Sequence, residues 1–150
     1  MVRLADGRAG AVQNGDIAPP ATAPLSIDET IALGKRFLGM PYTWGGTSSY
    51  GYDCSGFTQM LMRQRGYLMP RDARVQARWE RLIPVEKADL KPGDLLYFGS
   101  SDQHITHTGM YIGDGKFIDS TAHETPMVRV DNLAEPYWTK LFVAARRVKP

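Results

Sequence analysis

The stretch that decides the fold is residues 53–66, which read DCSGFTQMLMRQRG. Its apolar residues, beginning with Phe57, recur at spacings of three and four until Gly66, so we predict a helix that begins at Asp53 or Cys54. Cys54 is the single cysteine of the chain. The predicted helix therefore carries the one thiol in its first turn.

Helices are predicted on both sides of this stretch, and strands follow them. Ser26 and Glu29 form a capping box, and apolar residues continue at helical spacing up to Gly39. Residues 41–52 read as an irregular loop, and residues 72–81 as a short third helical piece. Strands are predicted at 94–98, 105–112, 116–121, 127–130 and 142–148. Helices first and strands afterwards predict an α+β fold, with N-terminal helices packed on an antiparallel sheet.

The composition changes near residue 25. The whole chain has 150 residues, 43% hydrophobic and 23% charged, which are ordinary proportions for one globular domain. Residues 1–24 contain three prolines and few large apolar side chains, so we predict a linker there. Residues 2–12 also read as a strand, an Asp-Gly turn and a strand, so a remnant of a preceding β module is the alternative. The main domain is predicted at residues 25–150.

Composition also excludes several classes of protein. A single cysteine excludes a disulfide scaffold. The 18 basic and 16 acidic residues are scattered and give a net charge of +2, which offers no electrostatic case for nucleic acid or an anionic membrane. No apolar run approaches the roughly 18 residues that a membrane helix needs, and residues 1–20 lack the apolar stretch of a signal peptide. No membrane insertion is expected.

Cys54 has two interpretations. A thiol attacks as the thiolate, which is favoured by a helix N-terminus and a neighbouring imidazole. The position between Asp53 and Ser55 at the head of a helix meets the first condition. A free cysteine can equally be buried and inert. The polar, glycine-bearing sequence after an aromatic-rich loop favours the reactive interpretation.

Three histidines could supply the imidazole. His107 lies within the predicted strand 105–112, where an inward-facing ring needs a partner. His104 precedes that strand among polar residues and is expected to be solvated, whereas His123 follows the next strand and stays open. One cysteine and three histidines in such dissimilar settings make a poor zinc site, so neither a metal nor another cofactor is expected.

The turn at residues 113–115 decides which residue can orient His107. If all three residues form the loop, Ile112 pairs with Lys116, and His107 and Asp119 share one face as diagonal neighbours. A two-residue Asp-Gly loop would instead put them on opposite faces. The first alternative predicts a constellation of Cys54, His107 and Asp119, in which Asp119 fixes the tautomer of the imidazole.

Four motifs in this order resemble the signature of the NlpC/P60 cysteine peptidases: YTWGG at 42–46, DCSGF at 53–57, LKPGDL at 90–95 and HTGMYIG at 107–113. The resemblance covers residues 26–148. It implies a papain-like fold and hydrolysis of peptidoglycan stem peptides or murein fragments, commonly between γ-D-glutamate and a diamino acid, either diaminopimelate or lysine. It further implies that Cys54 is the nucleophile and His107 the general base. Asp119 falls where many members have histidine, which leaves His123 as the substitute for the orienting residue.

The resemblance also implies substrate-binding residues. Tyr42 matches a tyrosine whose hydroxyl lies beside the nucleophile and helps to stabilise the oxyanion. Asp53 and Ser55 match residues that receive the amino end of the substrate, although Asp53 could equally be only a helix cap. The remaining residues expected to line the cleft are Trp44, Arg71 and Asp72.

Some alternatives stay open at this point. The same thiol and imidazole would suit a related cysteine amidase or acyltransferase, and a non-catalytic wall-binding module is the third reading. Relatives with these motifs often carry SH3-like domains ahead of the catalytic one, and the segment DGRAG at residues 6–10 resembles the end of such a domain. Turnover of the wall would imply the cell envelope or secretion, whereas recycling of fragments would imply the cytoplasm.

Overall fold

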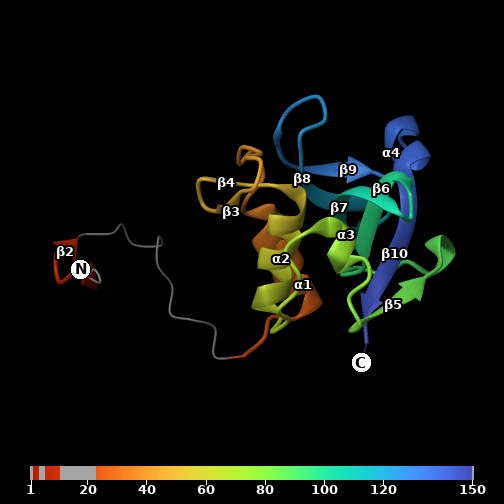
Figure 1. Ribbon diagram of the computed structural model, residues 1–150. Coiled ribbons are helices and arrows are strands. Elements are labelled where there is room, and N and C mark those ends of the chain that lie inside the picture. The colour runs from red at the N-terminus through yellow and green to blue at the C-terminus, as the bar shows by residue number, and fades with distance from the viewer. Residues whose placement is uncertain (1, 4–5, 11–22, 150) are drawn as a thin grey trace.

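The computed structural model describes residues 2–3, 6–10 and 23–149 (Figure 1). The helices are α1 (Ile27–Lys35), α2 (Cys54–Gln64), α3 (Ala73–Gln76) and α4 (Pro136–Leu141), with a 3-10 turn at Lys87–Asp89. The short strands are β1 (Val2–Arg3), β2 (Ala9–Gly10), β3 (Thr47–Ser48) and β4 (Gly51–Tyr52). The main strands are β5 (Leu82–Val85), β6 (Leu95–Ser101), β7 (His104–Gly113), β8 (Lys116–Thr121), β9 (Met127–Asn132) and β10 (Phe142–Val148). No helix in these ranges is long and apolar enough to cross a membrane.

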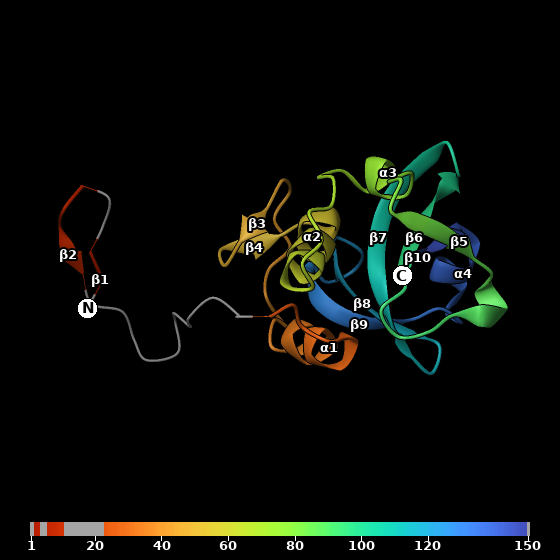
Figure 2. The ribbon, with the colours of Figure 1, turned by 90° about the horizontal axis from the view of Figure 1, so that it is seen from below.

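A six-stranded sheet forms the centre of the molecule. Its strand order is β5-β10-β6-β7-β8-β9, and every neighbouring pair is antiparallel. Figure 2 shows α1 and α2 together on one side of β7, with α4 on the other. The structure therefore confirms the predicted α+β fold, in which the N-terminal helices pack on an antiparallel sheet.

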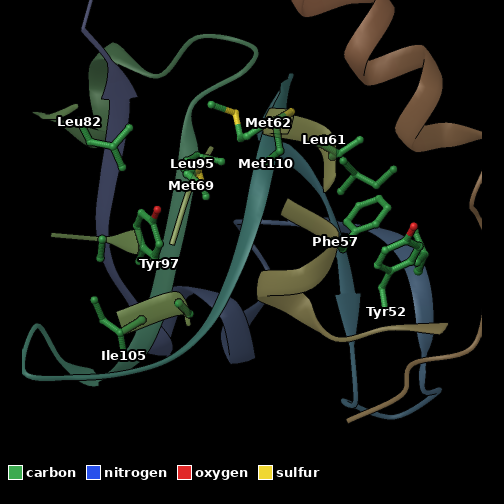
Figure 3. Close-up of a cluster of buried hydrophobic side chains, with 14 of the residues drawn as sticks. Tyr52, Phe57, Leu61, Met62, Met69, Leu82, Leu95, Tyr97, Ile105 and Met110 are labelled. Carbon is green, nitrogen blue, oxygen red and sulfur yellow. The ribbon is translucent and has the colours of Figure 1, made fainter. Parts of the chain in front are cut away.

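Two apolar clusters hold these layers together. In the first, Phe57 and Leu61 of α2 pack with Leu95 and Met110 of the sheet (Figure 3). In the second, Trp138 of α4 packs with aromatic and aliphatic side chains of the strands. Each fully buried large apolar side chain stabilises the fold by roughly 1.5–3 kcal/mol. The first cluster thereby fixes α2, and with it the single cysteine, against β7 and β8.

The first two helices begin where the sequence predicts. Ser26 caps α1, accepting from the backbone N–H of Glu29 at 3.2 Å, and the Glu29 side chain accepts from the backbone of Ser26 at 2.8 Å. α1 ends at Lys35, four residues before the predicted stop at Gly39. The chain turns away there and places Phe37 edge-on against Phe57, with ring centroids 6.3 Å apart. Tertiary packing thus outweighs the helical periodicity of this last turn.

Several elements differ from the predictions. The third helix is shorter than residues 72–81, and the loop predicted at 41–52 contains the β3–β4 hairpin. The edge strand β5 was not predicted because Pro84 interrupts its pattern, and proline is tolerated at the edge of a sheet. α4 was missed as well, since six residues are too few to establish a helical period.

The turn between β7 and β8 combines both alternatives considered from the sequence. Gly113, and not Ile112, pairs with Lys116, so the predicted pairing of Ile112 is wrong and the loop has two residues. Asp114 and Gly115 both have positive φ, which suits a tight hairpin turn. A bulge between Tyr111 and Gly113 absorbs one residue. The register beyond it, Met110 opposite Ile118, is the one that the three-residue alternative required.

The N-terminal segment forms the predicted strand, turn and strand. Val2 pairs with Gly10 and Arg3 with Ala9, while Asp6 accepts from the side chain of Arg8 at 2.7 Å. Half of the predicted linker, residues 11–22, lies outside the described residues. The assignment of residues 1–24 to a linker or to the end of a preceding SH3-like module stays a prediction.

Candidate active site

The thiol lies at the start of α2. Cys54 is the first residue of the helix, and Asp53 caps it by accepting from the backbone N–H of Gly56 at 2.7 Å. The sulfur therefore lies at the positive end of the helix dipole. Cys54 is 8% exposed, and its Sγ lies 4.0 Å from the carbonyl oxygen of Thr106 in β7. This contact brings the thiol against the strand that carries His107.

His107 and Asp119 form a close pair across the β7–β8 hairpin. Nε2 of His107 lies 2.6 Å from Oδ2 of Asp119, whose side chain is fully buried. Burial lowers the pKa of His107, but hydrogen bonds with Asp119 and Cys54 and their charges outweigh it and raise the pKa to about 10. Since Asp119 occupies Nε2, the ring nitrogen left for the thiol is Nδ1.

The contact with His107 also affects the pKa of the Asp119 carboxyl. Burial raises the pKa of its carboxyl to about 6, and the hydrogen bond with His107 opposes that rise. The raised pKa of His107 favours its imidazolium form at neutral pH, and the hydrogen bond with His107 favours the carboxylate form of Asp119. An imidazolium beside a sulfur at a helix start is the arrangement that activates a cysteine nucleophile.

Aromatic rings enclose the imidazole. The Trp138 ring is stacked on the His107 ring, with centroids 5.0 Å apart and an interplanar angle of 28°. Phe98 of β6 contacts the imidazole at 5.7 Å. Trp138 was not expected from the sequence, because nothing in the short α4 segment indicates a contact with a strand so far away along the chain.

Arg71 links the two residues that flank the cysteine. Its Nη1 donates to Asp53 Oδ1 and to Ser55 Oγ, each at 2.9 Å, and its Nη2 donates to Asp53 Oδ2. This charged bidentate contact is a strong form of hydrogen bonding. Asp53 is thus both the cap of α2 and the ion-pair partner of Arg71, and the Ser55 hydroxyl accepts a hydrogen bond from Arg71.

A cleft of about 560 Å³ opens over the thiol. Of the predicted substrate residues, Arg71 lies outside the lining, which includes Tyr42, Trp44, Asp53, Ser55 and Asp72. The opposite wall comes from the β6–β7 turn and the start of β7: Gln103, His104, Ile105 and Thr106. His104 is exposed in this wall, in line with the solvated position expected for it.

Tyr42 and Trp44 take different positions in the cleft. Burial raises the pKa of Tyr42 to about 12, and the negative charges of Cys54 and Asp53 add to the effect against that of Arg71. The Tyr42 hydroxyl therefore stays protonated and can donate a hydrogen bond near the sulfur. Trp44 is 90% exposed at the cleft rim.

His123 has partners away from the thiol. Its ring is stacked face to face on Tyr137 of α4, with centroids 3.6 Å apart, and Nε2 lies 3.7 Å from Glu124. Asp119, and not His123, contacts His107. Within the described ranges, no group of three or more His, Cys, Asp or Glu side chains could hold a metal ion.

Comparison with known proteins identifies the family. The model of the NlpC/P60 family matches residues 39–147, which is more than half of the chain. The chain belongs to the NlpC/P60 family. The resemblance drawn from the four sequence motifs is therefore confirmed.

Curated relatives of this NlpC/P60 chain include two gamma-D-glutamyl-L-lysine dipeptidyl-peptidases. The protein of Bacillus cereus is 40% identical over 99% of this chain and 43% of its own length. The protein of Bacillus subtilis is 36% identical over 91% of this chain and 46% of its own length. The chain thus spans less than half the length of these two relatives.

Solved NlpC/P60 structures share the fold. A crystal structure of an NlpC/P60 protein from Bacillus cereus has a TM-score of 0.79 at 38% identity, over 87% of this chain and 43% of that one. The NlpC/P60 domain of the peptidoglycan hydrolase SagA has a TM-score of 0.67 at 28% identity, over 84% of this chain and 100% of that one. The predicted papain-like NlpC/P60 fold is confirmed.

Proposed function

We propose that this NlpC/P60 chain is a cysteine peptidase that hydrolyses peptidoglycan stem peptides between γ-D-glutamate and a diamino acid. The observation that carries the proposal is the cleft in which Cys54 begins α2 and meets the strand of His107, itself paired with Asp119 at 2.6 Å. Relatives named gamma-D-glutamyl-L-lysine dipeptidyl-peptidase support the choice of bond. Cys54 is the nucleophile, His107 the acid and base, and Asp119 the residue that orients His107.

The reaction starts from a thiolate at Cys54 and an imidazolium at His107. The sulfur attacks the γ-glutamyl carbonyl carbon, and the oxyanion accepts hydrogen bonds from a backbone N–H at the start of α2 and from the Tyr42 hydroxyl. His107 gives its proton to the nitrogen of the diamino acid, the C–N bond breaks, and a thioester stays on Cys54. Water then gives a proton to His107 and attacks the thioester. This releases the γ-glutamyl carboxylic acid, which loses its proton to solvent, and restores the thiolate and imidazolium.

Asp72 is the acidic residue best suited to the amino end of the substrate. Asp53 already shares its charge with Arg71, whereas Asp72 lines the cleft, is exposed and forms no ion pair with any residue of the described part of the chain. The charge of Asp72 also acts on Arg71, but an exposed carboxylate without a direct ion pair at a cleft wall attracts an ammonium group. We therefore assign the amino end of the peptide to Asp72, with Asp53, Ser55 and Arg71 holding the wall beneath it and Trp44 bordering it.

The test is product analysis on defined peptides. L-Ala-γ-D-Glu-L-Lys and L-Ala-γ-D-Glu-diaminopimelate are incubated with the chain, and the products are identified by mass spectrometry. We expect the dipeptide L-Ala-γ-D-Glu and a free diamino acid, and no turnover with Cys54→Ala. Transfer of the acyl group to an added amine without hydrolysis would indicate an acyltransferase, cleavage of another amide an amidase, and binding without turnover a wall-binding module; each result contradicts the proposal.

A further inference from the structure

Trp138 is held firmly behind the proposed catalytic pair. It is 1% exposed in α4, and its indole packs against Phe98 of β6 at 5.0 Å and edge-on against Phe117 of β8 at 5.2 Å. Tyr137 contacts it edge-on at 4.8 Å. An indole enclosed on these sides has little rotational freedom, so whatever rests on its face is held in a defined plane.

The ring that rests on this face is the imidazole of His107. The centroid distance of 5.0 Å and the angle of 28° describe stacking of ring on ring. Stacking uses the face of the imidazole and leaves both nitrogens free in the ring plane. One of them, Nε2, faces Asp119 at 2.6 Å. Because one hydrogen bond still lets the ring turn about the axis of that bond, Asp119 alone does not fix where Nδ1 points.

We infer that Trp138 is a positioning residue for His107: its indole face fixes the plane in which Nδ1 points at Cys54, and it stabilises the imidazolium form. The inference rests on the proposed function. The electron-rich face of an indole attracts a cation, and tryptophan does so more strongly than phenylalanine. Trp138 thereby restricts the rotation of the imidazole ring that the hydrogen bond with Asp119 still allows. It also favours the imidazolium and thiolate pair that begins the reaction.

The charges around His107 stay the same when Trp138 is changed. Asp119 faces the imidazole from β8 and Cys54 from α2, with Arg129 and Asp131 of β9 next to Asp119. His123 lies edge-on to the indole at 5.9 Å. Replacing a neutral indole removes none of these groups. A shift in the protonation of His107 in such a variant therefore reports on the stacking itself.

The test compares Trp138→Leu and Trp138→Phe with the wild-type chain in the pH dependence of kcat/KM. We expect Trp138→Leu to lower the midpoint of the alkaline limb by about half a pH unit and kcat/KM at pH 7 about 10-fold, mostly through kcat. Trp138→Phe keeps a ring and should recover at least half of both effects. Phe142→Leu is the matched control, because Phe142 packs on Phe98 in the same cluster without contacting the imidazole, and both readouts should stay unchanged.

Trp138→Leu with a wild-type midpoint and only a lower melting temperature would overturn the inference, since that is the signature of a merely structural residue. If Trp138→Leu does not fold, Trp138→Phe decides: a small downward shift supports the inference, and an unchanged midpoint overturns it. Failure of the proposed function is distinguishable, because the wild-type chain itself would then lack hydrolysis that depends on Cys54.

Discussion

At the scale of single residues, the pair of His107 and Asp119 is central to the proposed site. Oδ2 of Asp119 lies 2.6 Å from Nε2 of His107, and this contact helps to raise the pKa of His107.

Which residues meet across the two strands of a hairpin can be predicted from the sequence, because a turn and the alternation of faces determine which side chains lie together. His107 and Asp119 could therefore be paired from the sequence, and Cys54 could be named because it is the single cysteine and begins a predicted helix. The bulge that restores their register could not be named, nor could the stacking of Trp138, since both depend on packing between distant segments.

Replacing Asp119 by asparagine should weaken the imidazolium. The amide keeps a hydrogen-bond acceptor but loses the carboxylate, whose hydrogen bond and charge act with those of Cys54 to raise the pKa of His107 to about 10, so the pKa falls toward its ordinary value. The alkaline limb of kcat/KM should move to lower pH, and kcat/KM at pH 7 should fall by roughly 10²–10⁴-fold. Asp114→Asn, in the exposed turn, is the control. An alkaline limb unmoved in Asp119→Asn would refute the orienting role.

The helix and strands that carry the proposed site agree with the sequence prediction more closely than the elements at its edge do. Both ends of α2 agree with the prediction, because a capping aspartate opens it and Gly66 follows its end. The strand β8 also has its predicted bounds. The edge strand β5 and the short α4 are set by what they pack against, so their sequences carry little signal.

The cap of α2 is predicted to stabilise the whole fold. Asp53→Ala removes the acceptor for Gly56 and the partner of Arg71, and should lower the free energy of unfolding by about 2 kcal/mol, of which the partly exposed ion pair supplies the smaller share. Asp53→Asn keeps the cap and should lose less than half as much. Urea denaturation measures both. Asp28→Ala, an exposed residue in the first turn of α1, serves for comparison. Equal losses in Asp53→Asn and Asp53→Ala would mean that the cap contributes nothing.

At the scale of the whole molecule, the four motifs that predicted the family lie around the cleft and in the tight turns. Residues 42–46 and 53–57 contribute to the cleft, and residues 107–113 carry His107 and the start of the hairpin. Family and fold were accessible from the sequence because these segments are constrained by chemistry and backbone geometry. The resemblance places the amino end of the substrate at Asp53 and Ser55, and this stays a prediction. The ion pair of Asp53 with Arg71 is what supports our proposal of Asp72 for that role.

The predicted boundary near residue 25 can be tested by truncation. Leu25 donates its backbone N–H to the carbonyl oxygen of Gln64 at 2.8 Å, which ties the chain to the end of α2 from this residue on. A chain of residues 25–150 should therefore keep the melting temperature to within about 3 °C, roughly the effect of 0.5–1 kcal/mol in a domain of this size. Differential scanning calorimetry of both lengths makes the comparison. A much larger drop would mean that residues 1–24 belong to the folded domain.

The most direct test of the central claim is the rate at which iodoacetamide alkylates Cys54, followed by mass spectrometry between pH 5 and pH 9. If His107 holds the sulfur as a thiolate, the wild-type chain should react readily at pH 6, and His107→Ala should react at least about 10-fold more slowly there and approach the wild-type rate only above pH 8. Equal rates for the two proteins at pH 6 would contradict this claim, because the imidazole of His107 would then have no effect on the reactivity of the Cys54 thiol.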